Sequence, residues 1–231
     1  MQNTNLDTGP SQGTPHRGRL KMAVLLSGSG TTLQNLLDRI SHGKLDARVV
    51  LVLSDRPGVF GLERAAKANI PHQVIDRKAF ASAQAFSEKM FEAIRASGAD
   101  LVVMAGFLRL LPIPPDFTHK VMNIHPSLIP SFCGKGFHGH HVHQAVLDAG
   151  NKITGCTVHF ADNEYDHGPI LVQKAVEVAE GDTADTLAKR VFTAECEAYP
   201  EAIEAFLLGR IQVTGRTARI LHPTDPAGWD S

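Results

Sequence analysis

Two polar side chains, Asn123 and His125, stand one residue apart at the end of an apolar run that begins at Val121. Residues two apart on a strand point to the same side, so both side chains can reach one ligand. An amide NH2 can donate to a developing oxyanion, and an imidazole can transfer protons near neutral pH. Attack of an amine on an acyl carbon requires both groups. The pair therefore predicts acyl transfer, although either residue alone is more often a structural hydrogen-bonding group.

A glycine-containing turn, residues 28–32 (Gly-Ser-Gly-Thr-Thr), separates an apolar run at 20–26 from leucines at helical spacing. Free backbone N–H groups and the helix dipole favour an anion at such a turn. Leu33 replaces the third glycine of a dinucleotide-binding fingerprint and no P-loop lysine is present, which disfavours NAD, FAD and ATP. The turn predicts a phosphate monoester site at Gly30, Thr31 and Thr32. The competing interpretation is a bare strand-to-helix turn.

Histidines and cysteines raise the question of a metal. His140 and His143 are three apart in a predicted helix and could share a ligand, but no carboxylate partner is obvious in the sequence. The three cysteines are odd in number and form no CxxC pair, which argues against a disulfide framework and a sulfur-ligated zinc site. We therefore expect an enzyme that uses no metal.

Apolar runs alternate with segments of helical periodicity along the chain. This alternation predicts an α/β fold with a doubly wound, mainly parallel sheet and helices on both faces, with ligands beyond the carboxyl ends of the strands. The expected strands are 20–26, 49–53, 72–75, 101–104, 121–124, 153–160 and 170–178, and the expected helices are 33–40, 62–68, 80–96, 140–149 and 183–208. We expect one domain, 19–213, between two mobile tails, 1–18 and 214–231, which have few core-forming residues.

Composition limits the partners. The chain has 231 residues, 43% of them hydrophobic, and a formal net charge of -1. A compact core is expected, and the broad positive field that nucleic-acid binding exploits is missing. No apolar run approaches the roughly 20 residues that span a bilayer, and residues 1–18 do not resemble a signal peptide. We expect a cytoplasmic monomer or homodimer that acts on small molecules, with neither a membrane nor a nucleic-acid partner.

Several motifs together resemble those of the folate-dependent formyltransferases. They are 123–128 (Asn-Ile-His-Pro-Ser-Leu), 105–111 (Ala-Gly-Phe-Leu-Arg-Leu-Leu), 166–169 (Asp-His-Gly-Pro), the turn at 27–34 and 195–200 on the last helix. The likeness runs from about residue 21 to 211. It implies a Rossmann-like formyltransferase fold, 10-formyltetrahydrofolate as co-substrate, and formyl transfer to the amine of glycinamide ribonucleotide (GAR) in purine synthesis.

The resemblance also implies roles for individual residues. Asn123 is expected to stabilise the oxyanion and His125 to transfer the proton. Asp166 is expected to order a water and to bias the histidine by raising its pKa. The residues implied at the ribonucleotide are Gly30, Thr31, Thr32 and Glu195, and those implied at the folate are Leu108, Arg109, Leu110, Leu111 and Asn123.

One position departs from the family. An arginine that often meets the phosphate is replaced here by Ala83-Gln84. We expect Arg77, Lys78 or Lys135 to supply the charge. A second open point is whether Pro126 or Pro130 follows a cis peptide bond.

Three other functions compete with GAR formyl transfer. A methionyl-tRNA formyltransferase carries a further C-terminal domain, for which the residues after 211 are too few. A formyltetrahydrofolate hydrolase typically carries an N-terminal regulatory domain, for which 1–18 is too short. A nucleotide-binding module without catalysis would require Asn123, His125 and Asp166 to occur together by coincidence.

Overall fold

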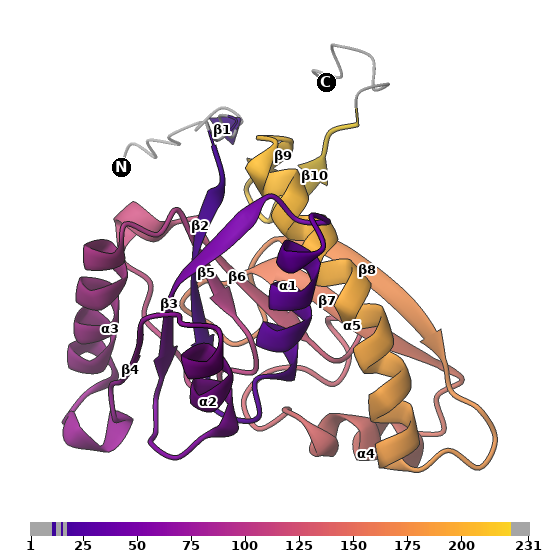
Figure 1. Cartoon of the computed structure of the whole chain (residues 1–231). Coiled ribbons are helices and arrows are strands. Elements are labelled where there is room, and N and C mark those ends of the chain that lie inside the picture. The colour runs from indigo at the N-terminus through magenta and orange to yellow at the C-terminus, as the bar shows by residue number, and fades with distance from the viewer. Residues whose placement is uncertain (1–10, 13–14, 16–17, 223–231) are drawn as a thin grey trace, which may run out of the picture.

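A computed structural model describes residues 11–12, 15 and 18–222, and places them around one ten-stranded sheet (Figure 1). Across the sheet the strands are β1 (Ser11–Gln12), β9 (Ile211–Thr214), β10 (Thr217–Ile220), β8 (Ile170–Glu177), β7 (Ile153–Phe160), β6 (Val121–His125), β5 (Leu101–Met104), β2 (Leu20–Leu26), β3 (Ala47–Ser54) and β4 (His72–Val74). The helices are α1 (Thr31–Ser41), α2 (Phe60–Lys67), α3 (Ala83–Ser97), α4 (His140–Asp148) and α5 (Ala184–Leu207), with 3-10 turns η1 (Arg77–Ala79) and η2 (Pro115–Phe117).

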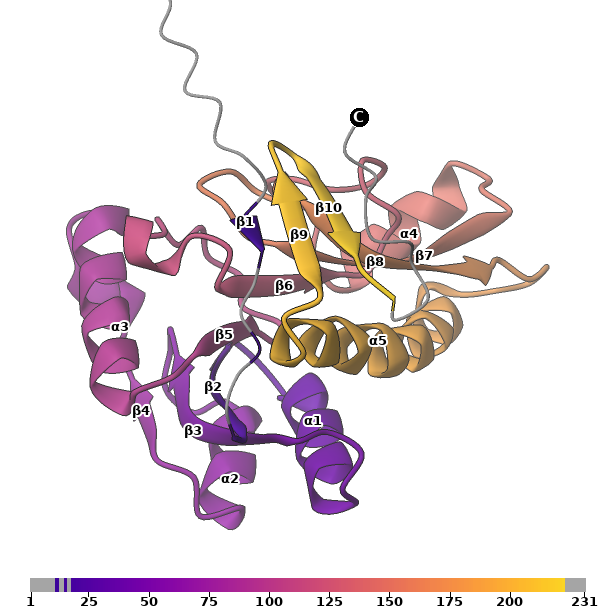
Figure 2. The same ribbon diagram turned by 90° about the horizontal axis from the view of Figure 1, so that it is seen from above.

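Helices cover both faces of the sheet, as the alternation predicts (Figure 2). β2 shows why, because its side chains alternate between two separate cores. Leu20, Met22, Val24 and Leu26 belong to the core that α1, α2, α4 and α5 cover, whereas Ala23 and Leu25 belong to the core under α3. A strand with helices on both sides is apolar on both faces, which explains the hydrophobic run that continues from Met22 to Leu26.

The sheet is mixed, so the expectation of a mainly parallel sheet holds for only part of it. Strands β4, β3, β2, β5 and β6 pair in parallel, whereas β7 pairs antiparallel with both β6 and β8. β7 and β8 are joined by the loop 161–169 with no crossover helix, and such short connections produce antiparallel neighbours.

The predicted boundary at Val213 is wrong on the C-terminal side. β9 and β10 form an antiparallel hairpin that continues past Val213 to Ile220, and β10 also pairs with β8. The hairpin turn contains Gly215, whose φ of 57° suits glycine. Periodicity missed β10 because only its alternate residues are partly buried. Residues 1–10 and 223–231 of the two predicted tails lie outside the described residues, and Ser11–Gln12 pair with β9.

One buried contact of α5 bears directly on the site. β5 and β6 are held together by Tyr199 of α5, whose buried hydroxyl lies 3.0 Å from the carbonyl oxygen of Met104, the last residue of β5, and 2.8 Å from that of Met122. Met122 directly precedes Asn123, so this contact fixes the strand end from which the site is built. Among the described residues, no helix is long and apolar enough to cross a membrane.

Candidate functional site

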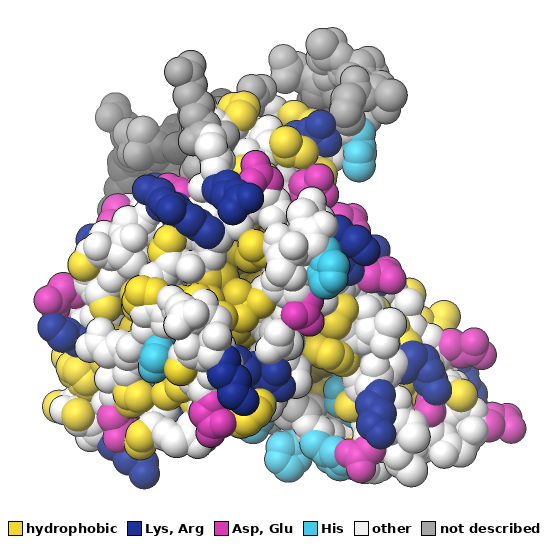
Figure 3. Space-filling model, in the orientation of Figure 1, with side chains coloured by type: hydrophobic (Ala, Val, Ile, Leu, Met, Phe, Trp, Pro, Cys, Tyr) yellow, Lys and Arg dark blue, Asp and Glu magenta, His cyan; other side chains and the backbone are white. Residues whose placement is uncertain are grey.

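A cavity of about 690 Å³ lies at the carboxyl ends of the parallel strands. Its walls come from the start of α1, the loop after β5, the end of β6, the glycine-rich segment 134–139, the loop 161–166 and one side of α5. Figure 3 shows histidine side chains gathered at the lower edge of the molecule, near the beginning of α4. Every predicted site residue except Gly30 lines this cavity, so segments far apart in the sequence meet as expected.

Asn123, His125 and Asp166 converge at the centre of the cavity. The Asn123 Nδ2 lies 3.4 Å from Asp166 Oδ1, and His125 Nδ1 lies 3.5 Å from Asp166 Oδ2. The His125 and Asp166 side chains are only 4% and 8% exposed. At this burial their mutual interaction is little screened by solvent.

The tautomer of His125 follows from its neighbours. Its Nε2 donates to the Phe132 carbonyl oxygen at 2.9 Å, so in the neutral ring Nδ1 carries the lone pair and faces Asp166. Burial lowers the pKa of His125 and outweighs the opposing effects of Asp166 and the Phe132 carbonyl. Asp166 therefore acts on the His125 pKa in the direction predicted, but burial decides the net shift.

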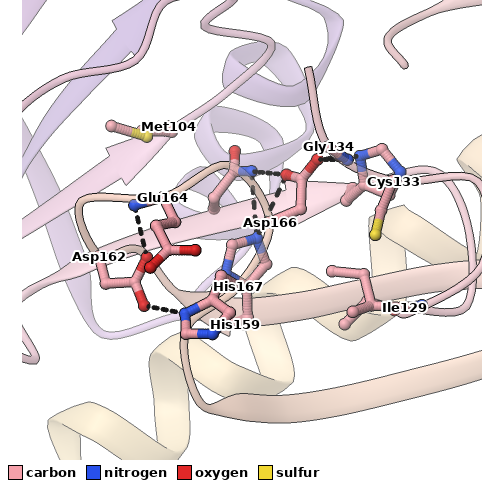
Figure 4. Close-up of polar contacts among 12 residues, drawn as sticks. Met104, Ile129, Cys133, Gly134, His159, Asp162, Glu164, Asp166 and His167 are labelled. Atoms are coloured by element: carbon pink, nitrogen blue, oxygen red, sulfur yellow. Dashed lines mark hydrogen bonds and ion pairs between the residues drawn. The ribbon is translucent and has the colours of Figure 1, made fainter. Parts of the chain in front are cut away.

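Asp166 is held in a strained loop between β7 and β8. Its φ is 53°, and Oδ2 accepts from the Gly134 N–H at 2.9 Å, as Figure 4 shows. A side chain at Gly168 would collide with the Phe160 carbonyl oxygen, which explains the glycine in this motif. Burial raises the pKa of Asp166, but interactions with His159, His125 and the Gly134 N–H lower it by a larger amount. The pKa therefore lies below its usual range. The carboxylate is ionised at neutral pH.

His159 is a fourth member of this cluster that the sequence did not reveal. It pairs with Asn123 across β6 and β7, and its Nε2 lies 3.2 Å from Asn123 Nδ2 and 3.7 Å from Asp166 Oδ1. Its Nδ1 donates to the Phe160 carbonyl oxygen at 2.9 Å, which leaves Nε2 to accept from Asn123 in the neutral ring. A histidine in an otherwise buried strand was the only signal in the sequence.

The turn at the start of α1 has the geometry of an anion site. Thr31 and Thr32 line the cavity, and the first helical hydrogen bond runs from Gln34 N–H to Gly30 O. Within the described residues, the N–H groups of Thr31 and Thr32 have no acceptor. These N–H groups and the helix dipole favour a phosphate.

Gly30 contributes to the turn in a way the sequence did not suggest. It has a φ of 70°, and a Cβ there would lie 2.6 Å from Gly61 Cα. The glycine is therefore required for contact with α2 as well as for the turn, and it does not line the cavity.

The basic residues near this turn agree only in part with those expected. Arg77 donates to Phe80 O and lies over Phe86, and neither it nor Lys78 lines the cavity, whereas Lys135 does. Arg64, which was not among the candidates, donates from Nε to Ser29 O at 2.9 Å and from Nη1 to Gln34 Oε1 at 2.8 Å. A guanidinium is therefore fixed beside the anion turn by α2.

Glu195 lines the cavity from α5. Burial raises its pKa to about 7. No hydrogen bond or ion pair to its carboxylate is found in the part of the chain that the structure describes. A half-buried carboxylate without a protein donor is suited to accept from ligand hydroxyl groups.

Residues 108–111 form the wall that the resemblance assigns to the folate. Leu108 is 37% exposed and Leu111 is buried in the core under α3. The Leu110 N–H donates to the Tyr165 hydroxyl at 3.0 Å, which joins this wall to the loop that carries Asp166. Tyr165 lines the cavity, is 39% exposed and was not predicted. The Arg109 guanidinium is paired with Asp55, whereas the sequence around it, taken alone, suggests an unpaired surface charge.

The α4 histidines were the candidate metal ligands. His140 Nε2 lies 3.5 Å from Asp185 Oδ1, so a carboxylate partner exists, but both side chains are exposed. His143 is 4% exposed, and burial together with His140 and His125 lowers its pKa. Among the described residues, no three His, Cys, Asp or Glu side chains are placed to hold a metal ion. Of the two prolines in question, Pro130 follows a cis peptide bond.

Several known proteins resemble this chain in both sequence and fold. The profile of the family described as formyl transferase matches residues 20–203. The chain is 36% identical over 197 residues to phosphoribosylglycinamide formyltransferase of Escherichia coli (strain K12), which covers 84% of this chain and 90% of that protein. It is 41% identical to the trifunctional purine biosynthetic protein adenosine-3 of Gallus gallus, over 87% of this chain.

The chain spans only 20% of the length of that trifunctional relative. Among solved structures, glycinamide ribonucleotide transformylase 1 from Symbiobacterium toebii superposes with a TM-score of 0.82 at 41% identity. The superposition covers 92% of this chain and 100% of that one.

Proposed function

This chain belongs to the formyl transferase family, and we propose that it transfers the formyl group of 10-formyltetrahydrofolate to the amine of GAR in purine synthesis. The convergence of Asn123, His125 and Asp166 in one cavity with an anion turn carries this proposal. The anion turn suits the phosphate of the ribonucleotide. The similarity to the Escherichia coli enzyme, over 90% of its length, supports the same choice of substrates.

The first step is attack of the neutral amine on the formyl carbon. A C–N bond forms, and the carbonyl π electrons move to oxygen to give a tetrahedral oxyanion. Asn123 donates to that oxygen from Nδ2. The two Nδ2 hydrogens face His159 Nε2 and Asp166 Oδ1. The contact to Asp166 is long, at 3.4 Å, and therefore weak, so this hydrogen can be donated to the oxyanion instead.

The second step moves one proton and breaks the bond to the folate. His125 Nδ1 is unprotonated in the neutral ring and can take the proton that the attacking amine loses. Asp166, 3.5 Å away, stabilises the resulting imidazolium. His125 returns this proton to the folate N10 as the C–N10 bond breaks, giving the formamide and tetrahydrofolate. When the amine enters as an ammonium group, one further proton is released to solvent.

Substrate positions follow from the walls of the cavity. The phosphate is placed at Thr31 and Thr32, with the positive charge of Arg64 behind the turn, and the ribose hydroxyl groups at Glu195. The folate is placed along 108–111. Neither step needs a metal, because a deprotonated amine is already a competent nucleophile.

A panel of formyl acceptors tests the proposal. Purified protein is mixed with 10-formyltetrahydrofolate and, separately, GAR, its phosphate-free ribonucleoside, charged methionyl-tRNA or buffer alone, and released tetrahydrofolate is measured. We expect turnover with GAR, much weaker turnover without the phosphate, and none with tRNA or water. Turnover in buffer alone would indicate a hydrolase, turnover with the tRNA a tRNA formyltransferase, and no turnover with any acceptor a binding module.

A further inference from the structure

Asp55 is a buried carboxylate that the proposed chemistry does not use. It directly follows β3, and its side chain is 0% exposed. Its Oδ2 accepts from Arg109 Nε at 2.9 Å, and its Oδ1 lies 3.4 Å from Arg56 Nε. An isolated buried carboxylate is costly, so these partners are what keep it in place.

The network around Asp55 reaches the cavity wall at two points. Burial raises the pKa of Asp55, but hydrogen bonds from Ser27 and Arg109 and the charge of Arg56 lower it more, so the carboxylate stays ionised. The Ser27 Oγ in turn accepts from the Leu108 N–H at 3.1 Å. Asp55 therefore holds the side chain of Arg109 directly, while the neighbouring Ser27 holds the backbone of Leu108.

Asp55 holds the Arg109 guanidinium by Nε alone. In the described part of the chain, no acceptor is found for the four N–H bonds on its Nη atoms. The side chain is 43% exposed and lines the cavity. A planar guanidinium that is anchored at one nitrogen and free at the others can bind a carboxylate or carbonyl oxygen with little further loss of side-chain entropy.

We propose that Asp55 is a positioning residue for the formyl donor, which fixes Arg109 so that the free N–H groups of its guanidinium face the folate. The inference rests on the proposed function, because it takes 108–111 as the folate wall. Asp55 does not line the cavity itself. Its effect therefore appears in the affinity for the donor and not in the chemical step.

The first test is Asp55→Asn, which keeps the size of the side chain and removes its charge. Loss of the anchored orientation should raise the KM for 10-formyltetrahydrofolate about tenfold, which corresponds to about 1.4 kcal/mol. We expect kcat and the KM for GAR to change by less than twofold. The matched control is Arg56→Gln, which removes the other arginine from Asp55 without touching the cavity and should leave both KM values within twofold. A purely structural role would change both KM values and lower Tm together.

A double-mutant cycle tests whether Asp55 acts through Arg109. Arg109→Gln should raise the donor KM at least as much as Asp55→Asn, and adding Asp55→Asn should raise it by less than a further twofold. Effects that multiply, or an Asp55→Asn enzyme with a wild-type donor KM, would overturn the inference.

A third variant covers the case in which Asp55→Asn does not fold. The lysine amine in Arg109→Lys can pair with Asp55 but, unlike a guanidinium, has no further N–H groups in a fixed orientation for the folate. The donor KM should therefore rise as in Arg109→Gln. A wild-type donor KM in Arg109→Lys would show that a bare positive charge suffices, and would overturn the role of an oriented guanidinium. Binding of tetrahydrofolate, measured by calorimetry without GAR, should weaken in parallel with the rise in KM. If wild-type protein binds tetrahydrofolate but transfers no formyl group to GAR, the proposed function fails while this test still stands.

Discussion

Replacing Asp166 by asparagine removes one negative charge from the centre of the cluster and keeps its shape. Asp166 Oδ2 lies 3.5 Å from His125 Nδ1, and both side chains are nearly inaccessible to solvent. In wild-type protein, burial already lowers the pKa of His125, and Asp166 partly offsets that effect. Without Asp166, protonated His125 would be buried with no anion facing its Nδ1.

The size of the effect follows from the distance. Two unit charges about 4 Å apart in an environment of effective dielectric constant about 20 interact by about 4 kcal/mol. A step that passes through protonated His125 should therefore slow by about 10³, within the usual range of about 10² to 10⁴ for lost acid-base catalysis. The KM values should change little, because Asp166 acts on the proton and not on binding.

Steady-state turnover at saturating substrate measures kcat, and a pH series measures the acid limb of kcat/KM. That limb reflects protonation of His125, so it should move to lower pH in Asp166→Asn, because the pKa of His125 falls further. His125→Ala should lower kcat to a similar degree, and the double variant should be far less than multiplicatively worse.

Asp185→Asn is the control for Asp166→Asn. It breaks a carboxylate–imidazole pair of the same 3.5 Å separation that is exposed to solvent, so kcat should change by less than threefold. Near-normal kcat in Asp166→Asn, or losses that multiply in the double variant, would refute the coupled roles of the two residues.

Four further predictions concern the rest of the site. Glu195→Gln should raise the KM for GAR and should also stabilise the protein at pH 8. The Glu195 pKa rises from 4.5 to about 7 on folding, so the stability of the wild-type protein falls as the pH rises through that window. Measurement of Tm against pH checks the effect on stability. Gly30→Ala should destabilise by roughly 2 kcal/mol or more in urea unfolding, because alanine is strained at this φ and its Cβ would meet Gly61; unchanged stability would contradict the packing described. Arg64→Gln should raise the KM for GAR several-fold and leave that for the folate unchanged, whereas Lys67→Gln, on the same helix but away from the turn, should alter neither. Turnover should survive EDTA, and loss that zinc restores would make the α4 histidines metal ligands.

Much of the fold can be predicted because its central strands are buried on both faces. Leu101–Met104 is apolar throughout and Leu20–Leu26 is apolar except at Lys21, and each ends in a turn of small residues. The β9–β10 hairpin gave no such signal, since it lies towards the edge of the sheet and only alternate residues of β10 are partly buried. The antiparallel direction of β7 was also missed, because periodicity identifies a strand but not its direction.

The site was predictable where a motif carries its own chemistry. Asn123 and His125 follow from alternation in one strand, and the anion turn follows from its glycines. Asp166 required a family resemblance, because a carboxylate in a glycine-containing loop is ordinarily a turn residue. Asp55 and His159 could not be found from sequence, since each matters through a partner on another strand or loop. The direction in which the His125 pKa shifts could also not be predicted, because it depends on how deeply the ring is buried.

Direct transfer of the formyl carbon is the central claim, and an isotope measurement tests it most directly. Protein in excess over 10-formyltetrahydrofolate labelled with ¹³C in the formyl group is mixed with GAR, quenched at successive times and analysed by mass spectrometry. We expect the label to appear in the formamide of the ribonucleotide at the rate at which tetrahydrofolate appears. No label should be found on the protein or in free formate, and the rate should fall by about 10² to 10⁴ in His125→Ala. Label that accumulates as formate, or on the protein before it reaches the ribonucleotide, would contradict direct attack by the amine at Asn123, His125 and Asp166.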